Sequence, residues 1–212
     1  MPPHRHGSPL EAPLHLIDLP KNVDWEGQIA YLDRDGVLNR WKEDYVNSPD
    51  DVEILSGSGK AISRLRGMGF RICVVTNQSP IGRGLWGHDI LAQINDRLQD
   101  LLLEEDHGAE IDVLLYSPYS PSENSWARKP NPGMLEAGRQ IIENAHRFPG
   151  KQNVILFGDD WVNRPSESNS ILIGDRYSDI TAAERVGVRG ILCDSESGLA
   201  GVIDQIKPNN GG

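Results

Sequence analysis

A chain of 212 residues with 38% hydrophobic and 25% charged residues is long enough for one well-buried globular domain. Its net charge of −10 argues against a nucleic-acid partner, because phosphate backbones are bound by surfaces with an excess of Lys and Arg. The two cysteines both lie in apolar runs, so we expect neither a disulfide framework nor a zinc cluster. The sequence has no apolar run of membrane-spanning length and no signal-peptide core, and we therefore expect a cytoplasmic protein.

The order of apolar patterns along the chain predicts an α/β fold. Residues 1–24 carry five prolines and three histidines and predict an irregular N-terminal arm. Strand-like runs are expected at 29–32, 70–75, 111–116, 154–157, 171–173 and 190–193, with helices at 58–68, at about 88–105, from 133 onward and through 182–186. This alternation predicts a doubly wound, Rossmann-like parallel sheet over residues 25–205, with an insertion at about 151–170 and a flexible tail at 206–212.

Two carboxylates, Asp33 and Asp35, directly follow the run at 29–32, and Gly36 lets the backbone turn there. Open α/β sheets bind their ligands at the carboxyl ends of strands. An aspartate at such an edge can act as a nucleophile toward phosphorus, and a neighbouring one can move the proton. The alternative interpretation is a surface Asp-Gly turn.

Polar clusters follow three further predicted strands and would share the same edge of a parallel sheet. They are Thr76 with Asn77, Arg128 with Lys129, and Asp175 with Asp179. The combined set of carboxylates, one hydroxyl, one amide and two cations suits a hard divalent cation together with a phosphoryl group. Mg²⁺ takes one or two carboxylates plus water and phosphate oxygens, and a lysine and a hydroxyl can orient the equatorial oxygens.

Four motifs at these positions give the chain a family resemblance: DRDGVLN at 33–39, TNQS at 76–79, RKPNPGM at 128–134 and GDRYSD at 174–179. In this order they resemble the haloacid dehalogenase-like phosphohydrolases over roughly residues 29–194. More narrowly, they resemble the D-glycero-D-manno-heptose 1,7-bisphosphate phosphatase branch, which is close kin to the histidinol-phosphate phosphatases. The stretch from Ile81 to Gly84 favours the heptose side, and the GDRYSD motif leans slightly to the histidinol side.

This resemblance implies roles for individual residues. Asp33 would be the nucleophile that becomes an aspartyl phosphate, and Asp35 would protonate the leaving alcohol and then activate the water. Mg²⁺ would be held by the Asp33 carboxylate, the Asp35 backbone carbonyl and Asp175. Thr76 and Lys129 would bind the transferred phosphoryl group.

The resemblance also implies a set of polar side chains around the rest of the substrate, namely Arg34, Asn77, Gln78, Ser79, Arg83 and Arg128. Asp179 would support the metal site from behind or cap its helix. A second acidic pair, Asp159 and Asp160, also follows a glycine, but we interpret it as a solvated turn.

One loop departs from the pattern of this branch. The branch usually has a zinc-binding loop before the Arg-Lys pair, with Cys-x-His and Cys-x-Cys, where this chain reads Ser117-Pro118-Tyr119 and Ser125-Trp126-Ala127. Structural zinc needs four Cys or His donors, so we predict no structural zinc. The loop must instead be shaped by Pro118, Tyr119, Pro121 and Trp126. This departure bears on the substrate more than on the chemistry.

The spacing between the motifs leaves no room for a large cap domain, so loops would cover the cleft, with candidate wall residues Trp41, Tyr45, Arg83, Trp86 and Trp126. The leading hypothesis is a Mg²⁺-dependent phosphatase acting on a small sugar phosphate, most simply heptose 1,7-bisphosphate. A histidinol-phosphate or other metabolite phosphatase is the second, and an inactive phosphate-binding or interaction protein the third. We expect a monomer with no nucleic-acid or membrane partner.

Overall fold

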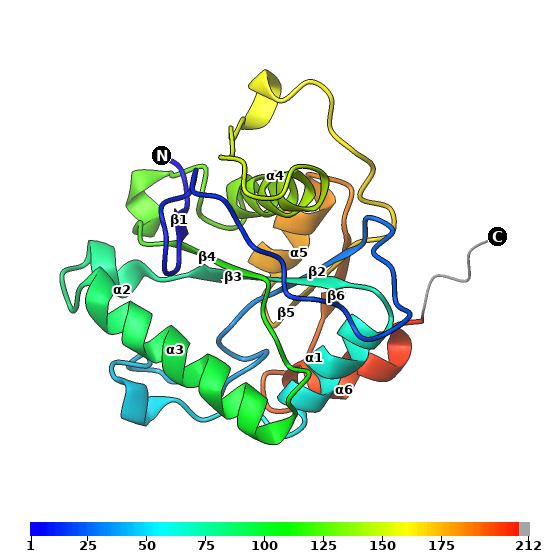
Figure 1. The fold of residues 1–212 in the computed structure, drawn as a ribbon. Coiled ribbons are helices and arrows are strands. Elements are labelled where there is room, and N and C mark those ends of the chain that lie inside the picture. The colour runs from blue at the N-terminus through cyan, green and yellow to red at the C-terminus, as the bar shows by residue number, and fades with distance from the viewer. Residues whose placement is uncertain (208–212) are drawn as a thin grey trace.

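The computed structural model describes residues 1–207 and contains one six-stranded sheet with helices on both faces (Figure 1). The strands are β1 (His4–Arg5), β2 (Ile29–Leu32), β3 (Arg71–Asn77), β4 (Val113–Ser117), β5 (Ile171–Gly174) and β6 (Arg189–Leu192). Their order in the sheet is β1-β4-β3-β2-β5-β6, and every pair is parallel except β1 with β4. The helices are α1 (Ser58–Gly67), α2 (Ser79–Gly82), α3 (His88–Glu105), α4 (Gly133–Arg147), α5 (Tyr177–Glu184) and α6 (Gly198–Val202). Short 3-10 turns lie at η1 (Pro49–Asp51), η2 (Pro121–Glu123), η3 (Gly158–Asp160) and η4 (Ile203–Gln205).

The alternation of side chains along β2 builds a core on each face of the sheet. Ala30 and Leu32 pack into one apolar cluster with α1, α3 and α6, whereas Ile29 and Tyr31 pack into another with α4 and α5. Figure 1 shows the same two helix layers, with α4 and α5 on one side of the sheet and α1, α3 and α6 on the other. Because β2 is covered on both faces and paired on both edges, its carboxyl end is held firmly.

The doubly wound α/β fold expected from the sequence is confirmed, and no separate cap domain interrupts residues 1–207. The prediction of a strand at 154–157 is wrong. This segment lies beside α4, where the Gln140 side chain donates to Leu156 O at 2.8 Å and accepts from Leu156 N at 2.9 Å. Ile155 and Phe157 pack against the core while their neighbours do not, so buried and exposed side chains alternate along this segment although it pairs with no strand of residues 1–207. The place beside β2 belongs to β5 instead.

The N-terminal arm is irregular for most of its length but is packed onto the domain. Strand β1, which the sequence did not predict, pairs antiparallel with β4, and His6 N donates to Leu114 O at 3.0 Å. Leu10 and Leu14 are buried in the same cluster as α4. At the other end of the chain, Ile206 is buried in the opposite cluster. The rest of the predicted tail from 208 onward lies outside the described residues.

Residues 151–170 run over the outside of α4 and contain η3 (Figure 1). Asp159 and Asp160 are exposed there, in agreement with a solvated turn. Within residues 1–207, none of the helices combines the length and the apolar character that crossing a bilayer requires.

The docking of the arm should weaken in mild acid. The His4 ring stacks on the His88 ring at 4.9 Å and on the Tyr116 ring at 5.4 Å, and His88 Nδ1 lies 2.9 Å from the Tyr116 hydroxyl. Burial, and then repulsion from His88, lower the pKa of His4 below its ordinary value of 6.5. The undocked arm therefore binds a proton more readily, and docking loses free energy as the pH falls below about 6.5.

Amide hydrogen exchange measured by NMR at pH 7.5 and 5.5, corrected for intrinsic rates, checks this expectation. The His6 amide should become less protected at pH 5.5, while amides of the central strand β3 keep their protection. Equal protection of His6 at both pH values would contradict it.

Candidate active site

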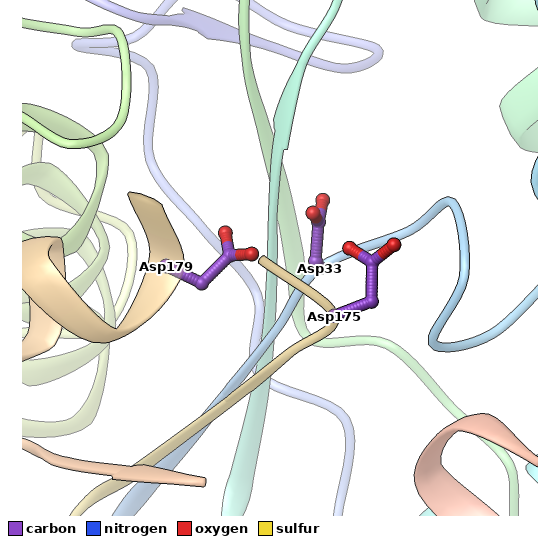
Figure 2. A group of neighbouring side chains, drawn as sticks. All are labelled: Asp33, Asp175 and Asp179. Atoms are coloured by element: carbon purple, nitrogen blue, oxygen red, sulfur yellow. The ribbon is translucent and has the colours of Figure 1, made fainter. Parts of the chain in front are cut away.

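The carboxyl ends of β2 and β5 bring three carboxylates together. Asp33 directly follows β2, Asp175 directly follows β5, and Asp179 lies in the first turn of α5. Oxygens of all three lie within 4.8 Å of one another, and Figure 2 shows Asp33 and Asp175 on neighbouring strand ends with Asp179 facing them from the helix. The sequence prediction that residues so far apart along the chain share one sheet edge therefore matches the geometry.

Lys129 is the buried cation of this cluster. Its ammonium lies 3.0 Å from Asp33 Oδ1, 2.5 Å from Asp179 Oδ1 and 2.8 Å from Val75 O, and the residue is only 3% exposed. Burial alone would lower the pKa of Lys129, but the attraction of Asp179 and Asp33 outweighs burial and raises it. The side chain is thus held in the charged form.

One lysine does not balance three carboxylates. Burial, reinforced by the charges of Asp179 and Asp35, raises the pKa of Asp33 to about 7, although Lys129 opposes the shift. Burial likewise raises the pKa of Asp175, with the charge of Asp179 adding to it and Arg176 opposing it. The site accordingly has an excess of negative charge that a bound cation would relieve.

Asp35 occupies a different environment from Asp33. Arg34, which is 1% exposed, donates to both Asp35 oxygens at 3.0 and 3.1 Å, while Asn39 donates at 2.9 Å and Gln78 at 3.0 Å. Burial opposes ionisation, but the charge of Arg34 and these hydrogen bonds together lower the pKa of Asp35. Arg34 also donates to Asn95 Oδ1 on α3 at 3.1 Å, so its guanidinium is fixed beneath Asp35.

Strand β3 supplies the Thr76 hydroxyl and the Asn77 side chain, which holds the Lys129 loop. Thr76 is 1% exposed, and its Oγ1 accepts a hydrogen bond from Gln78 Nε2 at 2.8 Å. Asn77 donates to Lys129 O and accepts from Lys129 N, both at 3.1 Å. The Asn77 side chain therefore holds the Lys129 loop against β3, and the residue also lines the cavity in which the sequence analysis expects it to contact the substrate.

A cavity of about 400 Å³ opens above this cluster. Its lining includes several residues expected from the sequence, namely Asp33, Arg34, Asp35, Trp41, Tyr45, Thr76, Asn77, Gln78, Ser79, Arg83, Arg128 and Lys129. Trp86 and Trp126 are not among the lining residues: their indole nitrogens donate to Asn47 Oδ1 and Glu136 Oε2 instead.

Two cations at the cavity were missed by sequence reasoning, Lys42 and Arg176. The Arg176 guanidinium lies over the Trp41 ring at 5.9 Å from its centroid. Arg176 belongs to the GDRYSD motif, so its position beside Asp175 could have indicated it. Lys42 lies in a turn-rich stretch without periodicity, and nothing in the sequence distinguishes it.

The carboxylate cluster fits a hard divalent cation. Asp175 Oδ1 is buried without a hydrogen-bond partner among the described residues. The atoms of Asp33, Asp175 and Asp179 that could bind a metal are all carboxylate oxygens, which Mg²⁺ prefers. Asp179 is less available, because Oδ1 faces Lys129 and Oδ2 accepts from Arg176 N at 3.1 Å. Asp33 and Asp175 would hold the cation directly, and Asp179 orients Lys129 while closing the first turn of α5.

Known proteins resemble this chain in sequence and structure. A family model described as HAD-hydrolase-like matches residues 126–209. The D-glycero-beta-D-manno-heptose-1,7-bisphosphate 7-phosphatase of Pseudomonas aeruginosa is 33% identical over 171 residues, which cover 81% of this chain and 83% of that protein. The corresponding alpha-heptose enzyme of Photorhabdus laumondii is 30% identical over 168 residues, covering 76% of this chain and 79% of that protein.

Among solved structures, the D,D-heptose 1,7-bisphosphate phosphatase from B. bronchiseptica, complexed with magnesium and phosphate, aligns with a TM-score of 0.64 at 28% identity. That alignment covers 84% of this chain and 97% of the other. A putative HAD-like phosphatase from Mesorhizobium loti aligns with a TM-score of 0.61 at 25% identity, covering 93% and 95% of the two chains.

Substituting Gly36→Ala should weaken metal binding. Gly36 has φ of 80°, and a Cβ there would lie 2.6 Å from Asp175 Oδ2, so the Asp175 carboxylate would have to move. Misorienting a ligand in this way should lower Mg²⁺ affinity by about 10–100-fold, measured by isothermal titration calorimetry.

Gly150→Ala is the matched control. Gly150 has φ of 78°, and a Cβ added there would meet nothing within 4 Å, so this variant carries the same backbone strain of roughly 1–2 kcal/mol without the clash. Equal Mg²⁺ affinity of the two variants would show that Gly36 has no part in placing Asp175.

Proposed function

The chain belongs to the haloacid dehalogenase-like hydrolases, in the branch of the D-glycero-D-manno-heptose-1,7-bisphosphate 7-phosphatases, and we propose that it removes one phosphate from a small sugar bisphosphate of this kind. It is a Mg²⁺-dependent phosphoric monoester hydrolase. The observation that carries the proposal is the buried Asp33 carboxylate, held by Lys129 and facing Asp175 below an open cavity.

In the first half-reaction, Asp33 is the nucleophile. One of its oxygens attacks the phosphorus atom, the bond from phosphorus to the substrate oxygen breaks, and Asp33 becomes an aspartyl phosphate. The leaving oxygen takes a proton from Asp35. Lys129 stays protonated between Asp33 and Asp179, so its positive charge faces the phosphoryl oxygens throughout, and the Thr76 hydroxyl lies at the same strand edge.

In the second half-reaction, Asp35 acts as the base. It takes a proton from water, the water oxygen bonds to phosphorus, and the bond between phosphorus and Asp33 breaks to release phosphate. The hydrogen bonds from Arg34, Asn39 and Gln78 keep Asp35 ionised, which suits this step. To serve as the acid in the first half, Asp35 must enter the reaction protonated and loosen its contact with Arg34.

A bound metal would complete the charge balance. Asp33, Asp175 and the backbone carbonyl of Asp35 would hold Mg²⁺, which would contribute positive charge to offset the charge that develops on the transferred group. Within residues 1–207, Asp175 Oδ1 is buried without a hydrogen-bond partner, so this oxygen would be available to bind the metal.

The mouth of the cavity supports a substrate with a second phosphate. Besides Arg34 and Lys129 beside the carboxylates, the cavity is lined by four cationic side chains, namely Lys42, Arg83, Arg128 and Arg176, although the whole chain carries a net charge of −10. Lys42 already pairs with Glu53 at 3.2 Å, so a second phosphate group would chiefly meet the charges of the three arginines among these four. Histidinol phosphate carries an amine and an imidazole at its far end, so the same mouth disfavours it. A cytoplasmic location and a monomeric state remain predictions.

Asp33→Asn should abolish turnover while leaving the fold intact. The carboxamide cannot attack phosphorus, so kcat on any phosphomonoester should fall by on the order of 10⁴-fold. Because burial already disfavours the ionised form of Asp33, a neutral isostere should not lower the melting temperature. Steady-state phosphate release and calorimetry measure the two effects.

Asp159→Asn, an identical change at an exposed position, is the control and should retain wild-type kcat. Phosphate release by Asp33→Asn at the wild-type rate would eliminate the aspartyl-phosphate mechanism.

A substrate comparison tests the specificity. Wild-type kcat/KM should be higher for heptose 1,7-bisphosphate than for heptose 7-phosphate, and lowest for histidinol phosphate. Arg83→Ala should reduce kcat/KM for the bisphosphate by about 10–100-fold, as for the loss of a charge-assisted contact, but should change the monophosphate little. Arg97→Ala on the outer surface of α3 is the control. A higher kcat/KM for histidinol phosphate would replace the sugar bisphosphate with the alternative.

A further inference from the structure

The loop at 117–127 lacks the donors that a metal would need. It presents serine, proline, tyrosine and tryptophan where the related branch has cysteine and histidine, so a structural zinc does not fit these residues. The loop nevertheless leads directly into Arg128 and Lys129 and must hold its shape. We propose that the first six residues of the chain take the place of the metal and position this loop at the mouth of the active site.

The first two residues insert into the loop through their carbonyl groups. Ser125 Oγ and Ala127 N both donate to Met1 O, at 3.1 and 3.3 Å, and the Tyr119 hydroxyl donates to Pro2 O at 3.1 Å. One short segment thereby cross-links the beginning and the end of the loop. A structural metal would join the same two parts of the loop through its ligands.

Strand β1 fixes this segment to the sheet. His4 pairs with Tyr116 of β4, the His4 ring stacks on Tyr116 and His88, and Pro3 is buried. Figure 1 shows the N-terminus beside the loop that contains η2. Met1 and Pro2 lie just before this paired strand, so their carbonyls are held close to the sheet, and the His4 side chain anchors the strand.

The contacts between the arm and the loop should affect the position of Arg128 more than that of Lys129. Arg128 donates to Tyr119 O at 2.9 Å, so its guanidinium depends on the segment that Pro2 holds. Lys129 is bound independently by Asn77 of β3 and by Val75 O. Loosening the arm should therefore disturb the mouth of the cavity, where a second phosphate would bind, and spare the reacting centre.

The experiment uses the full chain with His4→Ala, and with His15→Ala, an exposed histidine of the same arm, as the matched control. The Ala127 amide donates to Met1 O and also to Ser125 Oγ at 3.2 Å, and Ser125 Oγ itself donates to Met1 O. Displacing Met1 should loosen both contacts, so this amide should exchange with solvent about 2–10-fold faster in His4→Ala. In the same variant KM for heptose 1,7-bisphosphate should rise by about 2–10-fold with kcat changed less than about twofold. Turnover of 4-nitrophenyl phosphate, which has no second phosphate, should not change.

A second variant tests the route. Tyr119→Phe removes only the hydroxyl that contacts Pro2, so its effect on KM should not add to that of His4→Ala in the double variant. Independent, additive effects would mean that the arm does not act through this loop.

The kinetic part of this inference depends on the proposed function, whereas the exchange measurement does not. Faster Ala127 exchange in a protein that hydrolyses none of the phosphates would retain the positioning role and reject the substrate. Three results would each overturn the positioning role. The first is unchanged Ala127 exchange in His4→Ala, and the second is an equal loss of kcat on both substrates. The third is one equivalent of bound zinc whose removal by a chelator makes the Ala127 amide exchange faster.

Discussion

The structure depends on one buried ammonium, that of Lys129, between Asp33 and Asp179. Three carboxylates share this pocket with one buried cation, while the exposed Arg176 reaches only Asp175, at 3.8 Å. Burial makes the imbalance costly enough to raise the pKa of Asp33 to about 7. This excess of negative charge favours the binding of a positively charged ligand. A divalent cation is such a ligand, and the same pocket, once balanced, can receive the negative phosphoryl group. The charge that makes the free site unfavourable is therefore what gives it affinity for a metal.

The sheet supplies the precision that this charge balance needs. Asp33 and Asp175 project from β2 and β5, which pair through Leu32 and Ile173, so their spacing is set by backbone hydrogen bonds. Lys129 comes from a loop and has no such support of its own. Asn77 compensates by bonding both the N–H and the C=O of Lys129, which makes the loop an extension of β3. A side chain from a strand thus ties the backbone of the loop at Lys129 to the sheet.

The sequence could predict what depends on local pattern and short motifs. The strands that carry Asp33, Thr76 and Asp175 are apolar runs followed by polar motifs, and both signals lie within a few residues. Features that depend on distant partners could not be predicted. The segment around Leu156 alternates like a strand, but its backbone is satisfied by Gln140, which no periodicity indicates. Likewise, nothing in residues 1–6 reveals that Met1 contacts Ser125.

The loop before Lys129 is supported from a second side as well. Glu136, 1% exposed, accepts from Trp126 Nε1 at 2.7 Å and pairs with Arg164 of the 151–170 segment at 2.8 Å. A metal would bind the loop in one step, whereas ordering each residue of a chain segment costs about 1–2 kcal/mol of backbone entropy. The arm and the 151–170 segment must therefore be anchored by apolar burial of their own, which side chains such as Leu10 and Phe157 provide. On this argument, the apolar burial of both segments is what allows them to support the loop.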